Sequence, residues 1–250
     1  MTSTSPAQPA GQAAPAVSTV SAAQARNWLH TARFLTTAAQ LNQLPLLQVP
    51  EIAFVGRSNA GKSTCINTLT QQRQLAYASK TPGRTQHINL FELGKQGAVD
   101  AVLTDLPGYG YAAVPREAKI RWQQVMANYL MRRDNLRAVV MLCDSRHGLT
   151  ELDEGLLEII RPRVQDGLDF LVLLTKADKL NRAEGQKALS IAKLQTAGGG
   201  VRLFSALKKT GVDEVSLQLL QWAQSGLPQP LPEIESSGAA PEDEPPALDE

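Results

Sequence analysis

Short apolar runs alternate with amphipathic stretches along most of the chain. Buried strands are predicted where an apolar run is bounded by turn residues, and helices where apolar positions recur at helical spacing. The predicted strands are residues 52–55, 88–93, 99–104, 137–143, 169–174 and 201–204. The predicted helices are residues 62–70, 116–131, 152–160, 183–194 and 212–222. This alternation favours parallel strands joined by crossover helices. We therefore expect an α/β fold with a mostly parallel six-stranded sheet, helices on both faces, and a hairpin between residues 88–93 and 99–104.

Both ends of the chain differ in composition from the middle. Residues 1–25 contain no charged residue, and residues 228–250 are rich in Pro and carboxylates but contain no Lys or Arg. Such segments carry too little apolar surface to offset the entropy of ordering them. We predict one domain over residues 26–227, between a disordered N-terminal extension (1–25) and a disordered acidic tail (228–250).

The formal net charge of +1 conceals a basic domain. All 25 basic residues lie within 26–227, whereas seven of the 24 acidic residues lie in the tail, so the predicted domain carries about +8. A basic body suits RNA or another polyanion, although a basic face that only aids solubility fits the charge equally well.

The two cysteines and the lengths of the apolar runs indicate in which cellular compartment the protein works. Cys65 and Cys143 each stand inside an apolar run, so we interpret them as buried core residues rather than a disulfide. No apolar run is long enough to span a bilayer, and the N-terminus has no secretory signal. We expect a cytoplasmic protein without a membrane span, and a monomer.

The first chemical motif follows the first predicted strand. Residues 56–63 fit the P-loop pattern G-x-x-x-x-G-K-[ST], in which backbone N–H groups and a helix N-terminus surround phosphates. Lys62 would pair the β- and γ-phosphates, and Ser63 would bind Mg²⁺. A merely structural Gly-Lys turn is the alternative. The predicted phosphate-binding residues are Gly56, Arg57, Ser58, Asn59, Ala60, Gly61, Lys62 and Ser63.

A second motif, Asp105-Leu106-Pro107-Gly108, ends the predicted strand 99–104. The carboxylate of Asp105 can hold Mg²⁺ through its water shell, while the N–H of Gly108 can contact a γ-phosphate. Alone, Asp-x-Pro-Gly is also ordinary turn chemistry. It stands one hairpin after the P-loop, where a P-loop NTPase needs it.

A third motif, Thr175-Lys176-Ala177-Asp178, follows the strand 169–174 and indicates the base. The carboxylate of Asp178 can accept hydrogen bonds from N1–H and the 2-amino group of guanine, whereas adenine offers no such pair of donors. Alone, the motif is equally compatible with a solvated loop. Phe204-Ser205-Ala206 ends the last strand and would contact the guanine O6 through a backbone N–H. The four motifs in this order predict a GTP site.

Residues 79–86 lie between the P-loop and Asp105, where GTP switches have a loop that supplies a threonine to Mg²⁺ and the γ-phosphate. Thr81 and Thr85 both fit that role. A Pro-Gly surface turn is compatible with the same loop.

These motifs resemble the EngB family of ribosome-biogenesis GTPases, within the Era-like group of P-loop GTPases. The resemblance covers roughly residues 34–223. It is carried by residues 56–63, 80–86, 105–112, 144–148 and 174–180, of which Asp-Leu-Pro-Gly-Tyr-Gly-Tyr-Ala at 105–112 is the most specific.

The resemblance implies a single Ras-like P-loop GTPase domain that hydrolyses GTP with Mg²⁺. It implies a role in assembly of the large ribosomal subunit, through rRNA, and in cell division and septation. It also implies that Thr85, not Thr81, joins Ser63 and Asp105 on Mg²⁺. The nucleotide-contacting residues of this loop would then be Gly83, Arg84, Thr85, Gln86 and His87.

One residue expected for catalysis is absent from the sequence. Tyr109 stands where Ras-like enzymes have the glutamine that orients the attacking water, so another group must do so and intrinsic turnover should be slow. Lys62, Thr85, Gly108 and Asn59 are the catalytic candidates. Asn59 matches the position at which Era-like GTPases that use K⁺ carry Asn, although a loop-shaping hydrogen bond explains it equally well.

The segment after Gly108 has two further interpretations. Tyr109 and Tyr111, with nearby basic residues, could stack on single-stranded RNA, or the tyrosines could pack on the domain. The alternative function is a GTP-gated interaction protein with negligible hydrolysis, acting at the division site.

Overall fold

The computed structural model describes residues 20–76, 87–110, 116–197 and 199–228. The strands are β1 (Arg33–Ala38), β2 (Glu51–Gly56), β3 (Ile88–Lys95), β4 (Ala98–Asp105), β5 (Leu136–Asp144), β6 (Asp169–Thr175) and β7 (Gly200–Leu203). The helices are α1 (Ala22–Leu29), α2 (Lys62–Leu69), α3 (Arg116–Arg132), α4 (Glu151–Gln165), α5 (Arg182–Gln195) and α6 (Val212–Gln224). Two short 3-10 helices, η1 (Leu41–Gln43) and η2 (Ala177–Lys179), precede β2 and follow β6.

The strands form one sheet in the order β1-β3-β4-β2-β5-β6-β7. The pairs from β4 to β7 are parallel, whereas β3 and β1 are antiparallel additions at one edge. The mostly parallel sheet and the β3–β4 hairpin are therefore confirmed, but the expected six strands are wrong because β1 adds a seventh. Only Ala38 of β1 is buried. An edge strand with one buried residue lacks the apolar pattern that reveals strands in a sequence.

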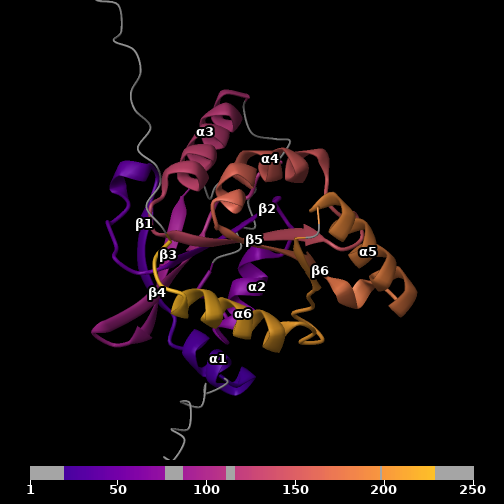
Figure 1. Cartoon of the computed structure of the whole chain (residues 1–250), viewed down its shortest axis with the longest axis horizontal. Coiled ribbons are helices and arrows are strands. Elements are labelled where there is room, and N and C mark those ends of the chain that lie inside the picture. The colour runs from indigo at the N-terminus through magenta and orange to yellow at the C-terminus, as the bar shows by residue number, and fades with distance from the viewer. Residues whose placement is uncertain (1–19, 77–86, 111–115, 198, 229–250) are drawn as a thin grey trace, which may run out of the picture.

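Helices cover both faces of the sheet, as expected. Helices α1, α2 and α6 pack in one core, and α3, α4 and α5 lie on the opposite face (Figure 1). Ile52 and Phe54 of β2 point into the first core, while Ala53 and Val55 point into the second. Because successive strand residues face opposite sides, a central strand covered on both faces must be apolar at every position.

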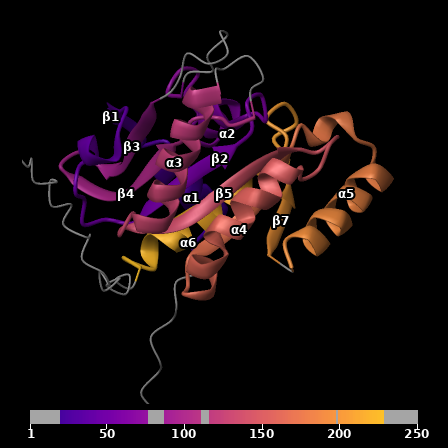
Figure 2. The same ribbon diagram turned by 90° about the horizontal axis from the view of Figure 1, so that it is seen from above.

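The parallel arrangement gathers the motifs. Figure 2 shows β1 and β3 toward one edge of the sheet and β7 with α5 toward the other, so that β2 and β5 are central. Strands β4, β2, β5, β6 and β7 run in the same direction, and their carboxyl ends meet at one edge. The segments that follow β2, β4, β6 and β7 are those predicted to bind a nucleotide, and such crevices at strand ends are where α/β sheets bind ligands.

Helix α1 extends the folded part of the chain toward the N-terminus. It starts at Ala22, so residues 22–25, which we assigned to the N-terminal extension, are helical. A reciprocal capping box between Ser21 and Gln24 starts the helix, and Arg26 forms an ion pair with Asp213 of α6. Residues 1–19 and 229–250, the rest of the two predicted disordered segments, lie outside the described residues.

Helix α4 is longer than predicted, because it continues through Pro162 to Gln165. Cys65 and Cys143 are both buried and free, which confirms that they are core residues; they belong to the cores on opposite faces of the sheet. Within the described part of the chain, no helix combines the length and apolar character needed to cross a bilayer.

Candidate nucleotide-binding site

The loop between β2 and α2 has a backbone shape that glycine and asparagine tolerate. Gly61, the N-cap of α2, has a φ of 93°, and Asn59 has a φ of 66°. Both lie in the left-handed region that most side chains avoid. Because Gly61 has no side chain to cap the first amides of α2, the positive end of this helix can receive an anion. A Cβ on Gly56 would lie 2.7 Å from the Leu142 carbonyl oxygen, so the loop passes β5 too closely for a larger residue.

Lys62 and Asp105 meet at the centre of this edge. The Lys62 amine forms an ion pair with Asp105, and the two side chains are only 11% and 4% exposed. Lys62 begins α2 and Asp105 ends β4, the neighbour of β2, so the first two motifs come together as predicted. The carboxylate of Asp105 and the hydroxyl of Ser63 are the hard oxygen donors that Mg²⁺ prefers, so the residues present fit that ion.

Gly108 lies directly against the P-loop. A Cβ on Gly108 would lie 3.1 Å from both Cα and N of Ser58. The Ser58 N–H donates to the Tyr109 carbonyl at 2.8 Å, and the Tyr109 N–H donates to the Gly56 carbonyl at 3.3 Å. This close approach favours a glycine at position 108 and places its backbone beside the predicted phosphate loop.

The Tyr109 side chain packs on the domain. Its hydroxyl donates a 2.6 Å hydrogen bond to Oδ1 of Asp153 on α4, and the residue is half-buried. Burial and the neighbouring carboxylate raise the pKa of Tyr109, so the hydroxyl stays protonated and remains a donor. Of the two interpretations given for Tyr109, the structure therefore shows packing on the domain and not an exposed ring for RNA stacking; Tyr111 lies outside the described residues.

The predicted base-recognition motif, residues 175–178, is hydrogen-bonded to the P-loop. Thr175 Oγ1 donates to the Ala60 carbonyl at 2.6 Å, and the Lys176 amine donates to the Asn59 carbonyl at 2.8 Å. Lys176 has a φ of 56°, which turns the chain sharply after β6. Two motifs more than a hundred residues apart in sequence thus form one surface, and the lysine stem remains one-third exposed beside it.

The third and fourth motifs also meet. The Ser205 hydroxyl donates to Oδ1 of Asp178 at 2.7 Å, and this hydrogen bond is the main reason that the pKa of Asp178 is lowered. The carboxylate is therefore ionised and able to accept. The amides of Phe204 and Ser205 bond to Leu174 and Thr210. Of the three amides proposed for the guanine O6, only that of Ala206 has no such bond within the described structure.

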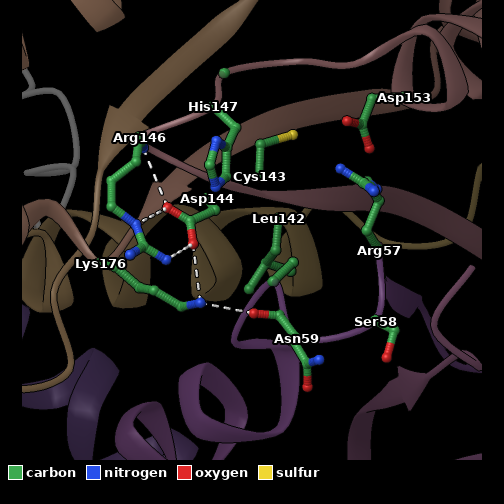
Figure 3. Close-up of a pocket in the computed structure, with 12 residues that line it drawn as sticks. Arg57, Ser58, Asn59, Leu142, Cys143, Asp144, Arg146, His147, Asp153 and Lys176 are labelled. Atoms are coloured by element: carbon green, nitrogen blue, oxygen red, sulfur yellow. Dashed lines mark hydrogen bonds and ion pairs between the residues drawn. The ribbon is translucent and has the colours of Figure 1, made fainter. Parts of the chain in front are cut away.

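Behind Lys176 lies a charged network that borders a cavity of about 250 Å³ (Figure 3). Asp144, at the end of β5, accepts from Arg146 Nη2 at 2.7 Å and pairs with the Lys176 amine at 2.9 Å. Hydrogen bonds from Arg146, and then the charge of Lys176, hold the pKa of Asp144 well below its usual range. The ionised Asp144 therefore keeps the Lys176 amine at the Asn59 carbonyl.

Known proteins share this sequence and architecture. The model of the 50S ribosome-binding GTPase family matches residues 51–176. A probable GTP-binding protein EngB from Albidiferax ferrireducens is 74% identical over 199 residues, which cover 80% of this chain and 96% of that relative. A protein of the same name from a Polaromonas species is 71% identical over 224 residues, 89% of this chain and 90% of the relative. The chain belongs to the EngB family.

Solved structures agree on the fold. A crystal structure of a probable EngB protein has a TM-score of 0.57 at 20% identity and covers 70% of this chain and 99% of that chain. Era in complex with MgGDPNP and nucleotides 1506–1542 of 16S ribosomal RNA has a TM-score of 0.56 at 22% identity, and covers 80% of this chain and 61% of Era. The predicted single P-loop GTPase domain is confirmed, and EngB membership makes the protein a GTP-binding member of that group.

In this EngB-family protein, part of the predicted site falls outside the described residues. These are Thr81, Gly83, Arg84, Thr85 and Gln86, the loop from which the Mg²⁺ threonine was chosen. His87 is described and is exposed just before β3. The roles given to this loop therefore stay predictions.

The EngB fold also brings to the site three residues to which the sequence analysis gave no role: Asp153, and Asp144 and Arg146 from the segment 144–148 that carries the resemblance. Asp144 ends an apolar strand, which is a signal that was available. Asp153 had a weaker signal, since it is the fourth residue of a capping box that begins at Thr150. Neither signal predicts which side chain forms a hydrogen bond or ion pair with the carboxylate of Asp144 or of Asp153.

Proposed function

We propose that this protein hydrolyses GTP with Mg²⁺ and acts as a switch in assembly of the large ribosomal subunit. We further propose that it works in the cytoplasm and that its loss disturbs cell division and septation. The nucleotide part rests most on one observation, namely that the four motifs meet at one edge of the sheet. The Lys62–Asp105 ion pair joins the first two, and the Asp178–Ser205 hydrogen bond joins the last two.

Base selectivity is assigned to Asp178. Its ionised carboxylate would accept from the N1–H and 2-amino groups of guanine, and the Ala206 amide would donate to O6. The Ser205 hydrogen bond fixes the carboxylate and favours its charged form. Adenine would leave this acceptor pair without donors, which is the kind of mismatch that gives strong discrimination.

Phosphate binding is assigned to the P-loop amides and Lys62, with Asp105 released from its ion pair when nucleotide binds. Ser63, Thr85 and Asp105 would then hold Mg²⁺, and Gly108 would contact the γ-phosphate. When bound, the ion neutralises charge on the β- and γ-phosphates. Lys62 would contribute in the same direction, since its amine can turn from a carboxylate to a phosphate without leaving this site.

Slow intrinsic hydrolysis follows from Tyr109. Its hydroxyl is bonded to Asp153, and a phenol has no carboxamide with which to align a water. The same observation favours the second candidate function, a GTP-gated interaction protein with negligible hydrolysis at the division site. Turnover of GTP with and without purified large subunits separates the two. Stimulation by the subunit supports the switch, and no turnover in either condition supports the gated binder.

Two observations support a ribosomal partner. The matching family is described as ribosome-binding, and the related fold of Era has been solved with a segment of ribosomal RNA. The predicted domain of about +8 is also suited to a polyanion.

The test is co-sedimentation of the full chain with purified large or small subunits, loaded with GDP or a non-hydrolysable GTP analogue. We expect the protein to pellet with large subunits, and only when it is loaded with the GTP analogue. Asp178→Asn is the matched control: it should lose pelleting with the guanosine analogue and regain it with the xanthosine analogue. Equal pelleting with both subunits, or pelleting that ignores the nucleotide, would contradict the proposal.

A further inference from the structure

Tyr109 is hydrogen-bonded to helix α4 through Asp153, a carboxylate whose two oxygens both accept hydrogen bonds. Its hydroxyl donates to Oδ1 of Asp153 at 2.6 Å. The other oxygen, Oδ2, accepts from the Thr150 N–H at 2.8 Å and from the Thr150 hydroxyl at 2.7 Å. Asp153 is 1% exposed. Since both oxygens are engaged and the residue is shielded from water, the carboxylate has one orientation, and the tyrosine hydroxyl has a fixed acceptor.

Helix α4 is itself held firmly by the rest of the domain. Leu156 and Ile160 pack in the core on that face of the sheet. Further along the helix, the buried Arg163 donates from Nη1 to the Leu130 carbonyl at 2.9 Å and to the Arg133 carbonyl at 3.1 Å, at the end of α3. The acceptor for Tyr109 therefore belongs to the rigid body of the domain and not to a loop.

The backbone of Tyr109 is fixed to the P-loop at the same time. Its carbonyl and N–H bond to Ser58 and Gly56, and Gly108 touches Ser58. The next residue, Gly110, passes through a narrow gap, where a Cβ would lie 3.0 Å from Leu152 Cδ1 and 3.2 Å from Arg57 Nε. Gly108 therefore lies between two fixed points. On one side is the end of β4, and on the other is Tyr109, which is held by both its backbone and its side chain.

We propose that the Tyr109–Asp153 hydrogen bond positions Gly108 for the γ-phosphate and thereby raises the affinity of this protein for GTP relative to its affinity for GDP. The inference rests on the proposed function, because it takes Gly108 as the γ-phosphate contact. Tyr109 and Asp153 are positioning residues, since neither touches the nucleotide. They act on the one backbone group that distinguishes a triphosphate from a diphosphate in the proposed site.

The variant Tyr109→Phe removes the hydroxyl and keeps the ring. We expect it to weaken binding of a non-hydrolysable GTP analogue about tenfold, which corresponds to about 1.4 kcal/mol, while the affinity for GDP stays unchanged. Asp153→Asn should shift the same ratio in the same direction. The double variant should do no more than the larger single change, because the two residues act through one contact. Titration calorimetry of the full chain with each nucleotide and Mg²⁺ measures these affinities.

Tyr129→Phe is the control. It also removes a buried tyrosine hydroxyl from a carboxylate, that of Glu51, but at the start of β2, at the other end of that strand from the P-loop. It should lower stability and leave the GTP-to-GDP ratio unchanged. A Tyr109→Phe protein that loses affinity for both nucleotides equally, or for neither, would overturn the positioning role. A wild-type protein that binds no guanine nucleotide would overturn the proposed function as well.

Discussion

A buried ion pair ties the end of α3 to the central strand, and its removal should be costly. Glu51 has no exposed surface and accepts from Arg133 Nε at 3.0 Å and Nη2 at 2.8 Å. The hydroxyls of Thr104 and Tyr129 also donate to it. Because Arg133 supplies the only positive charge bonded to this carboxylate in the described structure, Arg133→Met would leave a buried charge uncompensated.

Breaking a buried ion pair by removing one partner typically lowers stability by about 3–5 kcal/mol. We expect Arg133→Met to lower the free energy of unfolding by this amount. With a urea m value of about 2–3 kcal/mol per molar, the unfolding midpoint would fall by more than about 1 M. Tryptophan fluorescence follows the transition, since Trp222 is buried in the folded protein.

Two comparisons give this measurement its meaning. Adding Glu51→Gln to Arg133→Met removes the uncompensated charge, so the double variant should be less destabilised than the two single losses together. Arg161, whose pair with Glu158 is more than half exposed on both sides, should change stability by about 0.5 kcal/mol or less when replaced by Ala. If Arg133→Met were as mild as Arg161→Ala, or if the double variant were strictly additive, the reasoning from burial would be refuted.

Other predictions concern the nucleotide. Asp178→Asn should shift the preference from guanine to xanthine nucleotides, measured as the ratio of the two affinities; an unchanged guanine preference would refute the assignment of the base. The Ser205 hydrogen bond lowers the pKa of Asp178, so affinity for GDP should persist at pH values below the ordinary pKa of an aspartate. Ser205→Ala should raise that pKa, and affinity for GDP should then be lost at a higher pH as the solution is acidified. Asp105→Asn should reduce the Mg²⁺ dependence of GTP-analogue binding, measured by calorimetry with and without the ion; an equal dependence would remove Asp105 from the metal. If Asn59 helps to hold K⁺, turnover in KCl should exceed that in NaCl at equal ionic strength, and identical rates would remove that idea.

Local patterns in the sequence were sufficient where one segment carries its own signal. Strand β2 is apolar because it is covered on both faces, and the P-loop follows it with a fixed spacing, so both were predictable. The motifs around Asp105 and Asp178 were found in the same way, and parallel strands explain why they meet.

Contacts between segments were not predictable in the same way. Asp144 and Lys176 are 32 residues apart, and their pairing depends on the register of β5 with β6. The sequence left two interpretations open for Tyr109, packing on the domain or stacking on RNA, because nothing in its neighbourhood indicates the carboxylate on α4 that accepts its hydrogen bond. Edge strand β1 was not predicted for a simpler reason: only one of its residues, Ala38, is buried.

The pairing of α1 with α6 has a consequence for synthesis of the chain. These are the first and last helices of the described structure, they pack side by side, and both line the same core. During synthesis from the N-terminus, nearly the whole domain is made before α6, the partner of α1, exists. Until then the apolar face that α6 covers, beside α1 and α2, stays exposed. We expect nascent chains that stop before Val212 to be held in a protease-sensitive state, and the domain to close only as its final helix becomes available.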